Sequence, residues 1–217
     1  THEINNPLAN IAGRAKQMQR AANAENQKSL ETIYTSAMRA HDMLAEMMLA
    51  VKSPSLPRRY CDLAPMLLQV GEAWRETCHA SRMVWSCDIE DRRLGTLGDI
   101  AALQEVVHAA LRNAWEACSA GDSITLIAER IEDEEGQWIL RIAVQDSGPG
   151  IPIEMQDRIW DLYFSGREAG RGLGIGLAKI KRIVELHQGS VWIDSQAHSG
   201  CSLEMRLPWS KPLEGKR

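Results

Sequence analysis

The chain has 217 residues, enough for one large domain or for a small domain followed by a medium one. Its 44% hydrophobic and 25% charged residues are typical of a soluble globular protein, and a formal net charge of −4 argues against DNA or RNA as the main partner. No apolar run approaches the roughly 18–20 residues of a membrane span, no signal peptide is visible, and the missing initiator Met predicts a fragment with room for an upstream anchor.

Residues 1–52 carry the apolar pattern of a helical hairpin. Apolar side chains recur in alternating steps of three and four residues, which is the seam of a coiled coil or a four-helix bundle. Polar residues 23–27 suit a short turn between the two helices. Because such a hairpin buries too little surface alone, we expect a homodimer in which two hairpins form a four-helix bundle. The seam residues are Ile4, Leu8, Ile11, Ala15, Met18 and Ala22, then Leu30, Ile33, Ala37, Ala40, Leu44, Met47 and Val51.

Pro54 and Pro57 end the helical pattern and predict a linker over residues 53–59. A second domain is expected over residues 60–209, followed by a tail over residues 210–217. Helices combined with mostly antiparallel strands predict a two-layer α/β sandwich there, which makes the whole chain α+β. The expected helices are 63–78, 99–119 and 174–187, and the expected strands are 83–89, 123–130, 138–145, 191–194 and 202–207.

A histidine, His2, stands near the start of the first helix. Each helical residue turns by about 100°, which places His2 on the side opposite the apolar stripe. Asn6 lies one turn further along the same face. Pro7 cannot donate a hydrogen bond to the carbonyl of Glu3, so the helix is loosened beside the histidine. An accessible imidazole that is largely neutral at pH 7 is a candidate nucleophile.

Three later segments have the pattern of a nucleotide pocket. Asn113 lies inside a predicted helix and carries a side-chain amide. Asp146 ends a predicted strand and is followed by Ser-Gly-Pro-Gly, a turn with little room for side chains. The segment Gly-Arg-Gly-Leu-Gly-Ile-Gly at residues 170–176 runs into a helix, where free backbone N–H groups and the helix dipole favour phosphate.

These segments together resemble the sensor histidine kinases over about residues 1–209. The resemblance implies a dimerisation and phosphotransfer hairpin followed by an ATP-binding domain of the Bergerat type, shared with Hsp90, gyrase B and MutL. Single motifs of this kind are weak, but their common order is specific. In that order, residues 2–8 resemble the H-box in its HExxN form, 111–117 the N-box, 144–152 the G1 box, 159–167 the F-box and lid, 170–176 the G2 box, and 199–202 a poor last glycine box.

The resemblance implies a role for each residue of the H-box. ATP is expected to phosphorylate His2, while Glu3 takes the imidazole proton. Asn6 is expected to serve the reverse, phosphatase reaction. The phosphohistidine then passes its phosphoryl group to an aspartate of a response-regulator receiver domain, which docks on the face around His2, Ala9 and Gly13.

The resemblance also assigns the ATP-binding residues. Asn113 is the expected Mg²⁺ ligand, and Asp146 is expected to accept a hydrogen bond from the adenine amino group. Arg167 is expected to bind the terminal phosphate through its forked guanidinium. The other residues expected to bind the nucleotide are Gly148, Gly150, Gly172, Leu173, Gly174 and Gly176.

Ala109 departs from the family pattern, because the N-box usually carries a second polar residue one turn before Asn113. An alanine neither binds a metal nor orients a water, so alternatives stay open. One is a dimeric scaffold that binds nucleotide but is catalytically weak. A second is an ATPase or clamp of the gyrase/Hsp90 type, against which Ala109 and the hairpin both argue. A third is a protein in which the phosphatase activity of Asn6 dominates.

The number and spacing of the cysteines indicate the cellular compartment of the protein. Five cysteines without a C-x-x-C pair predict reduced thiols rather than a disulfide framework or a zinc site. We therefore expect a cytoplasmic core that makes no membrane contact of its own.

Overall fold

The computed structural model divides into two compact units, residues 1–55 and 56–217. It describes residues 11–18, 26–27, 29–34, 36–37, 40, 59–89, 94–162, 164 and 174–211. Among the helices of these residues, none has the length and apolarity to cross a membrane.

The first unit is helical wherever it is described, over residues 11–18 and in the stretches between 26 and 40. Ala12, Ala15 and Ala37 are buried. The ammonium group of Lys16 lies 5.2 Å from the centre of the Tyr34 ring. Ile11, Met18 and Ile33 of the predicted seam, by contrast, are 47%, 62% and 46% exposed. A single hairpin therefore covers only part of its apolar seam.

The second unit contains three long helices and seven strands in the described residues, and the expected helices and strands are confirmed to within a few residues at their ends. In chain order the elements are β1 (Arg59–Asp62), α3 (Leu63–Ala80), β2 (Val84–Ile89), β3 (Gly95–Gly98), α4 (Ile100–Ala117), β4 (Ser123–Glu132), β5 (Trp138–Asp146), α5 (Ile153–Gln156), α6 (Gly176–Leu186), β6 (Ser190–Ser195) and β7 (Cys201–Pro208).

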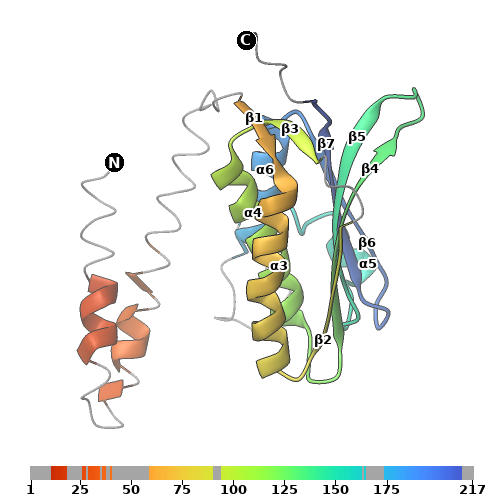
Figure 1. The fold of residues 1–217 in the computed structure, drawn as a ribbon. Helices are drawn as coiled ribbons and strands as arrows, with labels where there is room; N and C mark the ends of the chain where they lie inside the picture. Colours follow the sequence, from red (N-terminus) through yellow and green to blue (C-terminus); the bar gives the residue numbers. More distant parts are fainter. Residues whose placement is uncertain are drawn as a thin grey trace. The chain divides into compact units, whose positions relative to one another are not determined.

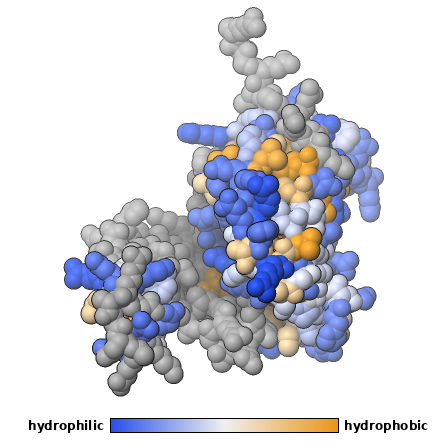
Figure 2. All heavy atoms as spheres, turned by 60° about the horizontal axis from the view of Figure 1, so that its bottom comes forward, coloured by the Kyte–Doolittle hydropathy of each residue, from blue (hydrophilic) through white to orange (hydrophobic). Residues whose placement is uncertain are grey.

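The main sheet has the strand order β2-β4-β5-β7-β6. The β2–β4 pair is parallel, and the other three pairs are antiparallel. Side chains alternate between the two faces of a strand, and in β4 the inward residues Ile124, Leu126 and Ala128 are fully buried. Helices α3, α4 and α6 cover this face (Figure 1), which confirms the two-layer sandwich. On the side of the molecule seen in Figure 2, hydrophobic residues form separate patches among hydrophilic ones.

Strands β1 and β3 form a small antiparallel sheet that the sequence pattern does not predict. Each has only four residues, and β3 begins and ends with glycine, a residue that favours turns over strands. The pair is held by its surroundings: Thr96 Oγ1 donates to the carbonyl of Pro208, and the Ser210 N–H donates to the carbonyl of Gly95. These contacts come from the far end of the chain, so local sequence contains no signal for them.

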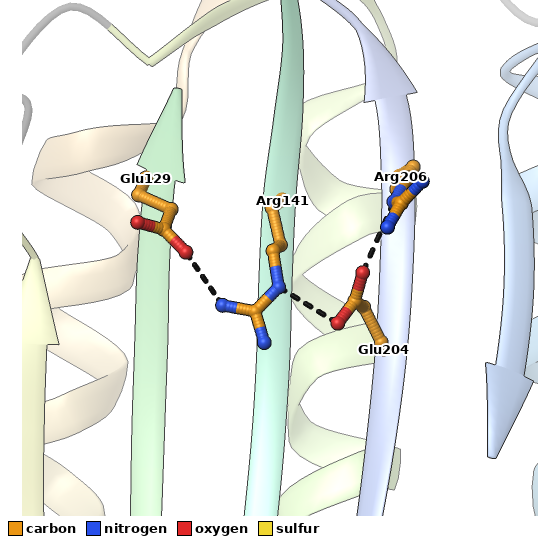
Figure 3. Close-up of polar contacts among 4 residues, drawn as sticks. All are labelled: Glu129, Arg141, Glu204 and Arg206. Carbon is orange, nitrogen blue, oxygen red and sulfur yellow. Dashed lines mark hydrogen bonds and ion pairs between the residues drawn. The ribbon is translucent and has the colours of Figure 1, made fainter. Parts of the chain in front are cut away.

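The opposite face of the main sheet carries a network of four charged residues from three adjacent strands (Figure 3). Arg141 of β5 binds Glu129 of β4 and, at 2.7 Å, Glu204 of β7. The guanidinium of Arg206 contacts the second oxygen of Glu204 at 3.0 Å and stacks over the Trp192 ring at 4.3 Å. The largely buried Glu204 carboxylate is therefore balanced by two cations, which allows charge on a shielded face.

His187 fixes the start of α4 from the end of α6. Its Nε2 accepts from the Asp99 N–H at 3.0 Å, so the ring proton sits on Nδ1, which donates to the carbonyl of Ile183 at 2.8 Å. The ring is buried. The Asp99 side chain in turn accepts from the N–H of Ala101 at 2.9 Å as the N-cap of α4. One imidazole thus joins the end of α6 to the start of α4.

Replacing His187 with Ala should lower the free energy of unfolding of the second unit by about 2–3 kcal/mol, because a buried ring and two hydrogen bonds are lost. Urea unfolding followed by tryptophan fluorescence measures this unit alone, since all seven tryptophans lie between residues 74 and 209. His79→Ala, at an exposed position of α3, is the matched control and should change the value by less than about 0.5 kcal/mol. Equal effects of the two variants would contradict the role of His187.

Candidate functional site

Asp146 lies where three strands of the main sheet end together. It pairs with Ile124 of β4 on one side and with Cys201 of β7 on the other. The Gly148 N–H donates to Asp146 Oδ1 at 2.9 Å, which fixes one carboxylate oxygen within the turn that follows β5. The turn is tied to β4 as well, since the Ser147 N–H donates to the Ser123 carbonyl and the Ser123 N–H donates to Ser147 Oγ. The predicted Asp-x-Gly-x-Gly turn is therefore a rigid part of the sheet edge.

Gly150 and Gly200 bring the turn after β5 against the turn before β7. Both have a positive φ, 68° and 84°. A Cβ at Gly150 would lie 1.9 Å from the carbonyl oxygen of Gln196, and one at Gly200 would lie 2.1 Å from the carbonyl oxygen of Asp146. No side chain fits at either position. The weak glycine box of residues 199–202 thus supplies a glycine that the site requires, and at Gly150 the protein's own backbone occupies the space.

The electrostatic setting of Asp146 is unfavourable for its charged form. Burial raises the pKa of its carboxyl group above the ordinary value, and nearby Asp122 adds to this, while the N–H groups of Gly148 and Cys201 act in the opposite direction. A carboxylate with a raised pKa at the rim of a sheet is typical of a functional position.

All five cysteines are free, as the sequence predicts. Two of them flank Asp146. Burial, followed by the charge of Asp146, raises the pKa of Cys118 to about 12 and that of Cys201 to about 12. Both thiols are therefore protonated and poorly nucleophilic at neutral pH. Within the described residues, no cluster of three or more His, Cys, Asp or Glu side chains is arranged to hold a metal ion.

The side chain of Asn113 on α4 lies against Gly176, the first residue of α6. A Cβ at Gly176 would lie 3.2 Å from Asn113 Oδ1 and 3.3 Å from its Nδ2, so the missing side chain leaves room for the amide. An ion pair of 2.8 Å between Lys179 and Glu105 joins the same two helices. Helix α6 begins at Gly176, and the side chain of its N-cap residue Ile175 makes no capping hydrogen bond. The first N–H groups of a helix have no partner within the helix itself. The N-box and the G2 box thus come together in space.

Ala109 lies one turn before Asn113 and is buried in the hydrophobic core. It offers no polar group at that position. Gly174, the other described glycine of the G2 box, precedes α6 with a φ of 67°. The remaining predicted residues, His2, Glu3, Asn6, Arg167, Gly172 and Leu173, lie outside the described residues.

An open pocket of about 370 Å³ lies beside the end of the glycine turn that follows β5. It is formed by residues of the turn, of α5 and of the β6–β7 connection. Neither Asp146 nor Asn113 is among its lining residues, so it is separate from the predicted nucleotide pocket. The residues that line it are Ile151, Pro152, Ile153, Glu154, Gln156, Ser195, Gln196 and Ala197.

Two protein families match the chain. Residues 1–55 match the His Kinase A (phospho-acceptor) domain, and residues 98–211, more than half of the chain, match the histidine kinase-, DNA gyrase B- and HSP90-like ATPase family. The chain belongs to the histidine kinase family. This identification agrees with the order of motifs in the sequence and with the α+β fold.

The chain spans only part of the length of the curated relatives that it matches. Sporulation kinase A of Bacillus subtilis is 26% identical over 95% of the chain, which corresponds to 33% of that relative. The sensory histidine kinase/phosphatase NtrB of Rhodobacter capsulatus is 31% identical over 93% of the chain, which corresponds to 58% of that relative. The chain thus spans between a third and three fifths of these two proteins.

Solved structures of histidine kinases share the fold. Full-length ShkA in complex with AMPPNP gives a TM-score of 0.77 at 21% identity, covering 97% of this chain and 45% of ShkA. ThkA in complex with the response regulator TrrA gives a TM-score of 0.69 at 21% identity, covering 96% of this chain and 59% of that one.

Replacing Asp146 with Asn should raise the stability of the nucleotide-free protein at neutral pH. Because the folded-state pKa of Asp146 is raised, its contribution to stability is fully present below the unfolded-state pKa and is lost as the pH rises through the folded-state pKa. The neutral amide removes this loss and can keep the bond from Gly148. Urea unfolding at about pH 7.5 and about pH 5 should show the advantage of the variant shrinking at the lower pH. An advantage that grows as the pH falls would refute the raised pKa.

Proposed function

We propose that the chain is the catalytic core of a sensor histidine kinase that uses ATP to phosphorylate His2 and then transfers the phosphoryl group to an aspartate of a response-regulator receiver domain. The observation that carries the proposal is the convergence of Asp146 with its glycine turn, and of Asn113 with Gly176, in a chain whose first residues match a phospho-acceptor domain. We place this core in the cytoplasm, where ATP is available.

The described residues fit a nucleotide. The buried carboxylate of Asp146, which already accepts from the Gly148 N–H through Oδ1, is an acceptor for the amino group of adenine. The start of α6, whose first N–H groups have no partner within the helix, suits the phosphates beside the Asn113 amide. Gly148, Gly150, Gly172, Leu173 and Gly174 complete the backbone cradle in this proposal.

The amide oxygen of Asn113 fits Mg²⁺, a hard cation that favours oxygen ligands and one or a few protein contacts. When bound, Mg²⁺ would neutralise charge on the ATP phosphates. Arg167 would add a forked cation at the terminal phosphate. These residues would position ATP and balance its charge. Positioning and charge stabilisation account for most of the catalysis of phosphoryl transfer.

The chemical step begins at the imidazole of His2. A ring nitrogen attacks the γ-phosphorus, the bond from that phosphorus to the bridging oxygen breaks, and ADP leaves with the electron pair. Glu3 accepts the proton that the ring loses. In the reverse direction Asn6 orients a water that hydrolyses the phosphorylated aspartate of the regulator. The relative NtrB carries both activities in its name, kinase and phosphatase.

We propose that the protein acts as a homodimer. The exposed seam residues Ile11, Met18 and Ile33 support this, because a second hairpin would cover them and complete a four-helix bundle. The response regulator would dock on the opposite face, around His2. The structure of ThkA is that of a complex with the response regulator TrrA.

A second candidate function is a dimeric scaffold that binds nucleotide without efficient phosphorylation. Ala109 favours it, because this buried position offers no polar group one turn before Asn113. The same alanine argues against a gyrase-like ATPase, which would need a general base there. Binding of ADP without phosphorylation of His2 would support the scaffold.

The variant His2→Gln should lose at least about 99% of phosphate incorporation from ATP labelled at the γ-position, since its amide is not a nucleophile. The phosphate on the original protein should be labile in acid. The exposed His79→Gln is the control and should incorporate label normally. Undiminished labelling of His2→Gln would show that another residue is the phosphate acceptor.

The variant Asn113→Ala should weaken binding of Mg·ADP by about tenfold or more, while the affinity measured in EDTA should fall less, because the lost oxygen belongs to the metal ion. Isothermal titration calorimetry with and without Mg²⁺ separates the two effects. Arg112→Ala, at the exposed neighbouring position of α4, is the control. Equal losses with and without Mg²⁺ would rule out Asn113 as the metal ligand.

A further inference from the structure

The backbone of Ile151, at the end of the glycine turn, is held by two side chains from outside the predicted motifs. Its N–H donates to Ser195 Oγ at 2.8 Å. Its carbonyl accepts from Gln156 Nε2 at 2.9 Å. Both polar groups of this residue are therefore bound to side chains that no expectation from the sequence assigns to the site.

Ser195 joins two turns through a single hydroxyl group. While Oγ accepts from Ile151, it donates to the carbonyl of Gly200 at 2.7 Å. Ser195 is the last residue of β6 and pairs with Cys201, the first residue of β7. The hydroxyl therefore connects the turn after β5 to the turn between β6 and β7, where the backbones are already in close contact at Gly150 and Gly200.

Gln156 adds a second connection between the same parts. Its Nε2 also donates to the carbonyl of Ser195 at 2.8 Å, so one amide group links α5, the glycine turn and β6. A third link comes from the His198 N–H, which donates to the carbonyl of Pro149 at 2.6 Å. We call Ser195 and Gln156 the turn clamp.

The turn clamp can fix the orientation of the Asp146 carboxylate without contacting it. The orientation of the Asp146 carboxylate depends on the Gly148 N–H, and Gly148 lies between the strand end and the clamped Ile151. If Ile151 loses these hydrogen bonds, the Gly148 N–H samples more positions. Binding of a ligand then has to order the turn, and this entropy cost weakens the affinity.

We propose that Ser195 and Gln156 are positioning residues that set nucleotide affinity by fixing the glycine turn beneath Asp146, without touching the nucleotide. This rests on the proposed function of Asp146 in binding adenine. The role belongs to the hydroxyl of Ser195 and to the amide donor of Gln156.

Calorimetric titration of the full chain with ADP in the presence of Mg²⁺ measures the affinity on which the proposal depends. Ser195→Ala should weaken ADP binding by about tenfold, which is the scale of one or two lost hydrogen bonds. Ser195→Thr, which keeps the hydroxyl group, should restore the affinity to within about twofold of the original. Ser190→Ala, an exposed serine at the other end of β6, should have no effect.

The initial rate of His2 phosphorylation at varied ATP concentration separates positioning from a general loss of structure. In Ser195→Ala the KM for ATP should rise by the same factor of about ten, while kcat at saturating ATP stays within about twofold. Backbone hydrogen exchange in the nucleotide-free protein should speed up at residues 148–151 and stay unchanged in α3.

Each result decides the proposal. Unchanged ADP affinity and KM in Ser195→Ala would overturn the turn clamp and leave the proposed function intact. Equal losses in Ser195→Ala and Ser195→Thr would overturn the role of the hydroxyl. If the original protein does not bind ADP, both proposals fail. If Ser195→Ala does not fold, Gln156→Met decides: it should show the same rise in KM, and an unchanged KM overturns the clamp.

Discussion

The site depends on a close backbone contact between two turns at one edge of the sheet. The turn after β5 and the turn before β7 approach so closely that neither Gly150 nor Gly200 has room for a Cβ, and both adopt a positive φ. The antiparallel pairing of β5 with β7 brings Asp146 opposite Cys201 and so leads directly into this contact. The carboxylate consequently lies on a fixed platform, with one oxygen held by Gly148.

The second half of the site comes from the helical layer. Helices α4 and α6 meet where Gly176 leaves space for the Asn113 amide, and His187 ties the far end of α6 to the start of α4. The two layers thus contribute different chemistry: the sheet edge offers a buried acceptor, and the helices offer the Asn113 amide and the N–H groups at the start of α6. Burial makes Asp146 unfavourable for the ligand-free fold, which is a common sign that a residue is retained for binding rather than for stability.

Much of the fold could be predicted from local pattern, because alternation in β4 and helical spacing in α4 report directly on burial. The glycine turn after Asp146 and the position of Asn113 inside a helix could be predicted too, because both follow from local sequence. Strands β1 and β3 could not, because their partners are distant in sequence. Ser195 and Gln156 carry no local signal either, since a serine at a strand end and a glutamine in a short helix are ordinary, and only tertiary contact gives them partners.

We propose that Asp146 recognises the amino group of adenine, and a ligand that lacks this group tests the proposal. Inosine diphosphate carries an oxygen where ADP carries the amino group, so it presents an acceptor to a carboxylate and leaves a buried polar group without its hydrogen bond. Calorimetric titration of the full chain in Mg²⁺ should show ADP binding at least about tenfold more tightly than inosine diphosphate. Equal affinities for the two nucleotides would contradict adenine recognition by Asp146.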